Sequence, residues 1–156
     1  MAERSGPALL IPPPLVFAAA CGAMYALHRF IPASRLDFPY AENIGLVIGL
    51  MGLLLFLMAG AGFVSRKTTV SPHHPEKTSA LVTDGVYSIS RNPMYLGMAL
   101  LTLAFAAIAL QPLGLILLAA AIWYITRFQI IPEENVLAEK FGKDYTAYRA
   151  KVRRWI

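Results

Sequence analysis

Four long apolar segments occupy most of this 156-residue chain. They run over about residues 15–31, 44–64, 94–110 and 113–131. Each has, or nearly has, the roughly 20 residues that a helix needs to cross a hydrocarbon core of about 30 Å. Charged residues make up 15% of the chain, whereas soluble domains carry about 25%. The sequence therefore predicts an all-α membrane protein, with about four transmembrane helices in a single domain over residues 1–156.

The third and fourth segments are separated by Gln111 and Pro112, and the connection carries no charge. This pattern favours a tight turn and an antiparallel helical hairpin. Alternatively, Pro112 only kinks one continuous helix, but about 38 residues are too many for a single crossing.

The second segment is rich in glycine. Small residues let the backbones of neighbouring membrane helices approach closely, so we expect these positions to be packing sites. An opening toward the bilayer is the alternative. The glycines are Gly45, Gly49, Gly52, Gly60 and Gly62.

Positive charge is distributed unevenly around the segments. Four Lys or Arg residues lie between the second and third segments and six follow the fourth, whereas the other side has only Arg29 and Arg35. The positive-inside rule then predicts that both termini and the 65–93 loop face the cytoplasm. The net charge of +5 fits this orientation and an attraction to anionic lipids better than nucleic-acid binding, because no basic run is interleaved with aromatic residues.

The N-terminal residues have no cleavage pattern of small residues, so the first segment is expected to stay in the protein. Cys21 is the only cysteine and lies in an apolar run. It is expected to behave as a small apolar side chain.

After Pro132, apolar residues recur at intervals of three or four. This spacing predicts an amphipathic helix over about 133–152, with Pro132 in its first turn. The helix would pack over the cytoplasmic end of the bundle or lie in the membrane interface. The recurring residues are Leu137, Phe141, Tyr145, Tyr148 and Val152.

Polar side chains gather where the third segment begins and the fourth ends. Glu133 and Glu134 either favour a helix N-terminus through its dipole or hold a cationic group at the membrane border. Arg91 and Asn92 either start a membrane helix or bind an anion there. Arg127 either reaches the interface or points into the bundle.

The 65–93 loop also carries His73 and His74. No cysteine or third histidine has the spacing of a metal-ligand set, so no metal site is expected.

Taken as a set, these residues resemble the integral-membrane isoprenylcysteine carboxyl methyltransferases, whose wider group includes phospholipid N-methyltransferases. The resemblance extends over about residues 66–156. It rests on LVTDGVY at 81–87, RNPMYLG at 91–97, RF at 127–128, EE at 133–134, and on Leu137, Phe141, Gly142, Tyr145, Tyr148, Arg154 and Trp155.

The resemblance implies an enzyme that uses S-adenosylmethionine as methyl donor and a lipophilic acceptor. By position, the adenosine side would be lined by Leu81, Val82 and Tyr87. The start of the third segment would cap the cofactor through Asn92, Pro93, Met94 and Tyr95. The cationic amino group would be held by Glu133 and Glu134, and Arg127 would lie toward the acceptor.

One position departs from the family pattern, because Asn92 stands where the family usually has histidine. Asparagine donates and accepts hydrogen bonds but does not titrate near neutral pH. An acid–base role at this position is therefore in question, whereas cofactor binding is not. The acceptor could be a prenylcysteine-like carboxylate, a lipid amine or a hydrophobic thiol. The alternative function is a non-enzymatic small membrane subunit with the same fold.

Overall fold

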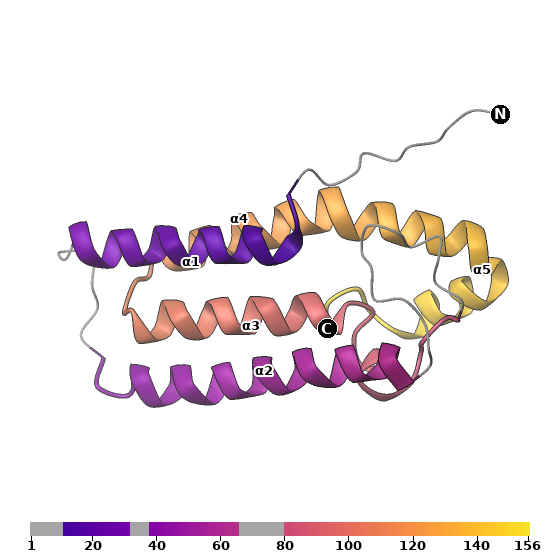
Figure 1. Cartoon of the computed structure of the whole chain (residues 1–156), viewed down its shortest axis with the longest axis horizontal. Helices are drawn as coiled ribbons and strands as arrows, with labels where there is room; N and C mark the ends of the chain where they lie inside the picture. Colours follow the sequence, from indigo (N-terminus) through magenta and orange to yellow (C-terminus); the bar gives the residue numbers. More distant parts are fainter. Residues whose placement is uncertain (1–10, 32–37, 66–79) are drawn as a thin grey trace.

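The computed structural model describes residues 11–31, 38–65 and 80–156, and all regular structure within these ranges is helical (Figure 1). The expectations for the N-terminal residues and for Arg35, His73 and His74 fall outside the described residues. Most of the predicted loop, residues 66–79, also falls outside them.

Five longer helices form the fold. They are α1 (Pro13–Phe30), α2 (Ala41–Ser65), α3 (Pro93–Ile108), α4 (Gly114–Ile125) and α5 (Ile131–Lys151). A short 3₁₀ turn, η3 (Gly85–Ser88), precedes α3, and a π-helical turn, η4 (Thr126–Ile130), joins α4 to α5. Figure 1 shows α3 between α2 on one side and α1 with α4 on the other, while α5 extends beyond the bundle.

The predicted turn between the third and fourth segments is present. The helix α3 ends at Ile108 and α4 begins at Gly114. Leu110 takes a positive φ of 53° in this turn. His28 of α1 helps to close this end, because its Nδ1 lies 2.8 Å from the carbonyl oxygen of Ala109.

The packing of α2 on α3 depends on glycine. A Cβ at Gly97 would come within 2.8 Å of the Gly52 carbonyl oxygen, and a Cβ at Gly52 would come within 2.9 Å of the Gly97 carbonyl oxygen. Two backbones therefore touch here with no space for a methyl group. Gly45 also lies close to α3, whereas a Cβ at Gly60 would meet nothing within 4 Å. The packing interpretation thus holds for part of the glycine set.

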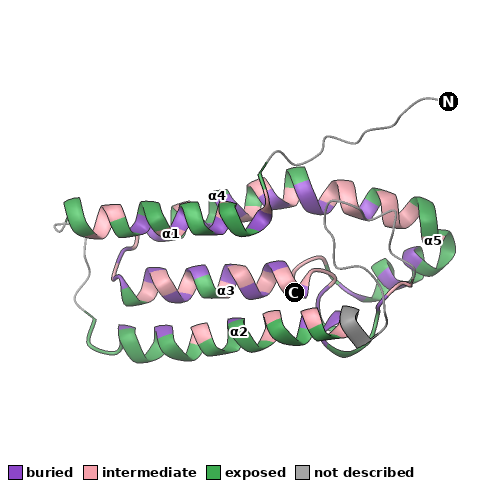
Figure 2. Cartoon of the chain, viewed as in Figure 1, coloured by how far each residue is buried: buried purple, intermediate pink, exposed green. Residues whose placement is uncertain are grey.

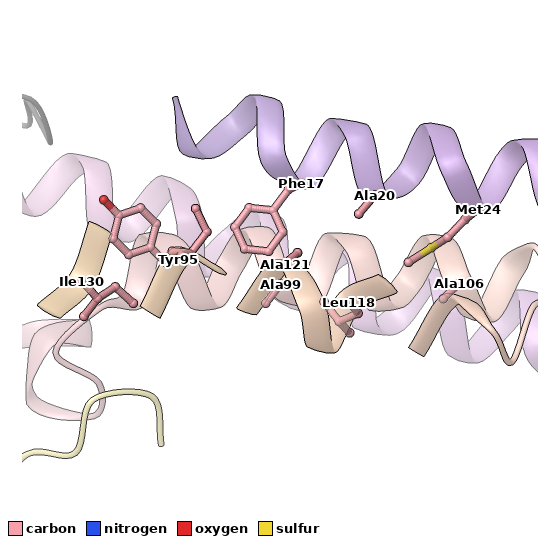
Figure 3. Packing of buried hydrophobic residues seen from close by; sticks show 10 residues of the cluster. Phe17, Ala20, Met24, Tyr95, Ala99, Ala106, Leu118, Ala121 and Ile130 are labelled. Atoms are coloured by element: carbon pink, nitrogen blue, oxygen red, sulfur yellow. The ribbon is translucent and has the colours of Figure 1, made fainter. Parts of the chain in front are cut away.

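The other side of α3 faces the main apolar core, which α1, α3 and α4 build together (Figure 3). In this view Phe17, Ala20 and Met24 of α1 point toward the side chains of α3 and α4. Alanine predominates in α3 and α4 at this contact, so the helices approach closely without large side chains. The core residues are Phe17, Ala20, Met24, Tyr95, Ala99, Ala106, Leu118, Ala121, Ile125 and Ile130.

The outer face of α2 is apolar and exposed, as the green stretches in Figure 2 show. Its exposed large side chains are Ile44, Leu46, Val47, Leu50, Met51, Leu53, Leu54, Leu57 and Met58. Exposed apolar faces of this size are typical of surfaces that meet lipid or another protein.

Among the described residues, two helices are long and apolar enough to cross a membrane, over Ala41–Gly62 and within Gly114–Lys151. The apolar helix α3 is shorter, at 16 residues. The number of four spans therefore stays a prediction.

The sequence predicts that a helix ends near Ile131 and that a separate one starts with Pro132. The structure instead continues the helical path from Gly114 past Pro132 as far as the break at Gly142. Pro132 lacks the N–H that an α-helix would use at that position. The preceding turn is π-helical, and such local adjustments accommodate proline within a helix.

The predicted C-terminal helix also differs in its second half. Gly142 has φ 50° and ψ −114°, which interrupts α5. The helix then ends at Lys151, and Val152 is extended rather than helical. The chain consequently turns back toward the bundle, and we call residues 152–155 the return segment.

Candidate cofactor site

The candidate site lies at one end of the bundle, where the start of α3, the turn η4 and the first turn of α5 meet. The return segment approaches the same place, and Figure 1 shows the C-terminal end of the chain beside the start of α3. Residues far apart in the sequence are thus brought together. The site is built from residues 80–95, 126–134 and 152–155.

Glu133 is held by two neutral donors. The Tyr95 hydroxyl donates to Glu133 Oε1 at 2.9 Å, and the Gln129 side-chain amide donates to the same oxygen. Gln129 is 4% exposed and Tyr95 is 8% exposed, so both donors are buried. The carboxylate therefore has a fixed orientation.

Helix geometry explains why these side chains meet. Tyr95 is in the first turn of α3, because Asn92 is the N-cap and Pro93 the first helical residue. Gln129 is in the π-helical turn and Glu133 is four residues later. Residues four apart lie on one face of a helix, and that face is directed toward the start of α3.

Glu134 is in a different environment. It is 7% exposed and forms two ion pairs, with Arg91 Nη2 on Oε1 at 2.7 Å and with Arg154 Nη2 on Oε2 at 2.7 Å. Arg154 Nε also donates to Oε1 at 3.1 Å. The hydrogen bond to this carboxylate raises the pKa of Arg154 above its usual value. Both oxygens of Glu134 are thus occupied by guanidinium groups.

The return segment is bound to residues 90–92 through main-chain atoms. The Arg91 N–H donates to the Arg153 carbonyl at 3.0 Å, and Asn92 Nδ2 donates to the Arg154 carbonyl at 3.0 Å. The Asn92 side chain therefore does not cap α3. Trp155 Nε1 donates to Thr126 Oγ1 at 3.2 Å, which ties the return segment to η4 as well.

The described part of the loop before α3 is packed on both sides. Val82 and Tyr87 are buried against Ala59 of α2, with Met94 beside them. The Tyr87 carbonyl accepts a hydrogen bond from the Tyr148 hydroxyl at 2.6 Å. Burial raises the pKa of Tyr87, so its phenol stays neutral.

Leu81 belongs to a separate apolar cluster, around Tyr145, Tyr148 and Val152. Pro93 is buried at the start of α3. The predicted loop residues are thus divided between two apolar clusters: Val82 and Tyr87 lie together against α2, and Leu81 lies with residues of α5 and with Val152.

Arg127 is placed differently from the other predicted residues. It is exposed, and its neighbours Trp123 and Phe128 are 63% and 39% exposed. Trp123 and Phe128 make an edge-on ring contact with centroids 5.9 Å apart. Arg127 is therefore an exposed residue of η4, and no hydrogen bond or ion pair among the described residues joins it to Glu133.

Several residues of the site have no clear sequence signal. Ser90 is 1% exposed, and its hydroxyl accepts a hydrogen bond from the Asn92 N–H at 3.1 Å. Thr126 accepts a hydrogen bond from Trp155, which is 29 positions later in the sequence. Gln129 stands out in the sequence only as a polar residue in an apolar run.

Two observations fit a cofactor that carries an ammonium group and an anionic group. No cation among the described residues forms an ion pair with Glu133, which is partly buried and held by two buried donors. The buried Arg91 Nε has no acceptor among the described residues. Buried polar atoms normally have partners, so the site offers one acceptor and one donor to a ligand.

Comparison with known proteins relates the chain to methyltransferases. The model of the phospholipid methyltransferase family matches residues 41–144. Protein-S-isoprenylcysteine O-methyltransferase B of Arabidopsis thaliana is 30% identical over 118 residues, covering 72% of this chain and 57% of that protein. The Tribolium castaneum protein-S-isoprenylcysteine O-methyltransferase is 30% identical over 129 residues, which cover 79% of this chain and 43% of that protein.

The Saccharomyces cerevisiae protein-S-isoprenylcysteine O-methyltransferase is 36% identical over 77 residues, covering 49% of this chain and 32% of that protein. The chain thus spans between about a third and three fifths of the length of these relatives. Since the family model covers α2, α3, α4 and most of α5, the chain belongs to the phospholipid methyltransferase family.

Proposed function

We propose that this protein transfers a methyl group from S-adenosylmethionine to a lipophilic acceptor at the border of the membrane. The observation that carries the proposal is the partly buried Glu133 carboxylate, which Tyr95 and Gln129 hold and which has no cationic partner among the described residues. Family membership and the names of the relatives support methyl transfer.

Glu133 would hold the ammonium group of the cofactor. A carboxylate that is already oriented loses little conformational entropy on binding. Its attraction for the ammonium group therefore contributes almost fully to the affinity. Neutral donors such as Tyr95 and Gln129 fix the carboxylate without neutralising it. A pair of lysines in their place would compete with the ligand for the same charge.

When bound, S-adenosylmethionine supplies an electrophilic methyl group on a cationic sulfur. The residues of the chain then act by positioning and by excluding water, which accounts for much of the rate in reactions of this kind. Asn92 and Arg91 are polar groups at the start of α3 that face this end of the bundle. No residue of the site is required as a nucleophile.

The acceptor is lipophilic in this proposal. The relatives are named for isoprenylcysteine and the family for phospholipids, so a prenylcysteine-like carboxylate and a lipid amine are the two acceptor classes with support. A hydrophobic thiol is the third class to include in an assay. The exposed apolar face of α2 and the apolar path within Gly114–Lys151 agree with a membrane protein that such acceptors can reach.

The experiment that tests the proposal is calorimetric titration of S-adenosylhomocysteine, the product form of the cofactor, into the purified full chain in detergent. We expect micromolar binding to the wild type. Glu133→Gln keeps the shape of the side chain and removes its charge, and it should weaken affinity at least tenfold, or about 1.4 kcal/mol. Glu139→Gln is the matched control, because Glu139 is exposed on the same helix.

Two results would contradict the proposal. A well-folded wild type that does not bind S-adenosylhomocysteine would favour a small membrane subunit without enzymatic activity. Equal affinities of the Glu133→Gln variant and the wild type would show that the cofactor does not use Glu133.

A further inference from the structure

We propose that Arg154 is a positioning residue of the cofactor site and that Glu134 acts with it rather than on the cofactor. In this assignment Arg154 and Glu134 hold the return segment, residues 152–155, against the start of α3. The return segment then orients Asn92 and Arg91. The inference rests on the proposed function, since it assigns roles within the same site.

The two neighbouring glutamates have different partners. Glu133 accepts from two neutral groups, whereas Glu134 accepts three hydrogen bonds from two guanidinium groups. The second arrangement satisfies the carboxylate with charge-assisted bonds and leaves it no net attraction for an ammonium group. Glu134 is therefore a structural partner of the two arginines, and Glu133 is the residue available to the cofactor.

Arg154 contacts the site through both its side chain and its main chain. The guanidinium group is bound to both oxygens of Glu134. The carbonyl oxygen accepts from Asn92 Nδ2 at 3.0 Å and from the Ser90 hydroxyl at 3.4 Å. A displacement of Arg154 would therefore also displace the Asn92 side chain, which is bound to its carbonyl oxygen.

Arg91 completes the connection from the opposite side. Its Nη2 pairs with Glu134, and its Nη1 donates to the carbonyl oxygens of Arg149 at 3.2 Å and Val152 at 3.3 Å. With these contacts, Arg91 links the start of α3 to the end of α5 and to the return segment. Glu134 is the common partner of both arginines, so the loss of Arg154 leaves a buried carboxylate with one of its three hydrogen bonds.

The adjacent residues provide a control and a reporter. Arg153 has an exposed side chain, and only its carbonyl oxygen contacts the start of α3. Trp155 is partly buried and donates to Thr126. The emission of Trp155 therefore reports whether the return segment is in place, independently of any ligand.

The experiment uses the full chain with Trp123→Phe, which leaves Trp155 as the single tryptophan. Arg154→Gln, Arg154→Lys and Arg153→Gln are compared in this background. Two quantities are measured, the affinity for S-adenosylhomocysteine by calorimetry and the emission and acrylamide quenching of Trp155. Thermal unfolding confirms that each variant is folded at the temperature used.

We expect Arg154→Gln to weaken S-adenosylhomocysteine binding about tenfold, which is within the range usual for a residue that acts on binding without touching the ligand. Its Trp155 emission should shift to the red and quench more readily without ligand. Arg154→Lys keeps the charge and should recover part of both losses. Arg153→Gln should match the parent in both measurements.

The inference is overturned if Arg154→Gln keeps the affinity and emission of the parent, or if Arg153→Gln loses as much as Arg154→Gln. It is also overturned if lysine at position 154 recovers nothing, since the role would then not depend on charge. If the parent itself does not bind S-adenosylhomocysteine, the proposed function fails first. The Trp155 emission then still shows whether Arg154 holds the return segment.

Discussion

The Tyr95 hydroxyl lies 2.9 Å from Glu133 Oε1 and joins the first turn of α3 to the first turn of α5. The two residues are 38 positions apart, so this hydrogen bond couples two separate helices at the candidate site. A hydrogen bond to a charged group is worth about 1.5–3 kcal/mol. The contact is therefore strong enough to influence both the orientation of Glu133 and the binding of a cation.

Tyr95→Phe should weaken S-adenosylhomocysteine binding about tenfold, or about 1.4 kcal/mol, because the carboxylate loses one of the donors that orient it. In a Glu133→Gln background the same change should have little further effect, since the two residues act through one contact. Calorimetry of the four proteins measures this coupling. Tyr25→Phe, at an exposed position of α1, is the control. Fully additive losses would contradict a shared role.

Gly97→Ala should destabilise the fold by about 1–3 kcal/mol, the usual cost of overpacking. The added Cβ would lie 2.8 Å from the Gly52 carbonyl oxygen, and neither backbone can move without displacing a helix. Gly60→Ala in α2 is the comparison, because its Cβ would meet nothing within 4 Å. It should be neutral or stabilise by up to about 1 kcal/mol through helix propensity. Thermal unfolding in detergent measures both, and equal stability of the two variants would argue against the close contact.

Gly142→Ala should destabilise α5 by about 1–3 kcal/mol. Its φ of 50° with ψ −114° is a conformation that residues with a Cβ rarely adopt. Gly22→Ala, at a helical position with no atom within 4 Å of the added Cβ, should not destabilise. The unfolding temperatures of the two variants, compared with that of the wild type, measure this difference in stability. Unchanged stability of Gly142→Ala would mean that the helix continues through this position.

The distribution of lysine and arginine predicts which side of the membrane each end of the bundle faces. In a Cys21→Ser background, a cysteine at Lys143 should react with a membrane-impermeant maleimide only from the cytoplasmic side. A cysteine at Tyr40 should react only from the opposite side, since Tyr40 precedes α2 and is exposed. The Cys21→Ser parent gives the background. Labelling of both positions from one side would overturn the predicted orientation.

The helical elements could be predicted because hydrophobic segments and turn residues are local signals. The turn around Gln111 and Pro112 separates α3 from α4 as expected. The residues at 87–95 and 133–134 lie at one end of the bundle, which follows from a hairpin whose ends meet. To predict these features, only the lengths of the apolar segments and the alternating direction of successive helices are needed.

The continuation of the helix past Pro132 could not be predicted in the same way. Proline after an apolar segment usually marks the end of one helix and the start of another. A π-helical turn has no characteristic amino-acid composition by which it could be recognised. The break at Gly142 has a related cause, because a single glycine within a helical pattern is also compatible with an unbroken helix. Both features depend on tertiary contacts.

The different partners of Glu133 and Glu134 could not be predicted either. Adjacent residues on a helix point in different directions, and the partner of each depends on which segment packs there. Glu134 meets Arg154 only because the chain reverses after Lys151. The return segment accepts hydrogen bonds through the main-chain carbonyl oxygens of residues 152–154, and such acceptors leave no pattern in the sequence.

The return segment also determines the order in which the molecule is completed during synthesis. Residues 90–92 leave the ribosome about 60 positions before the residues that they bind, and chains generally fold from the N-terminus as they are made. The membrane helices can therefore pack while the cofactor site is still open. A chain stopped at Lys151 should insert normally and yet leave Arg91 and Asn92 accessible to water, which hydrogen exchange at these residues would reveal.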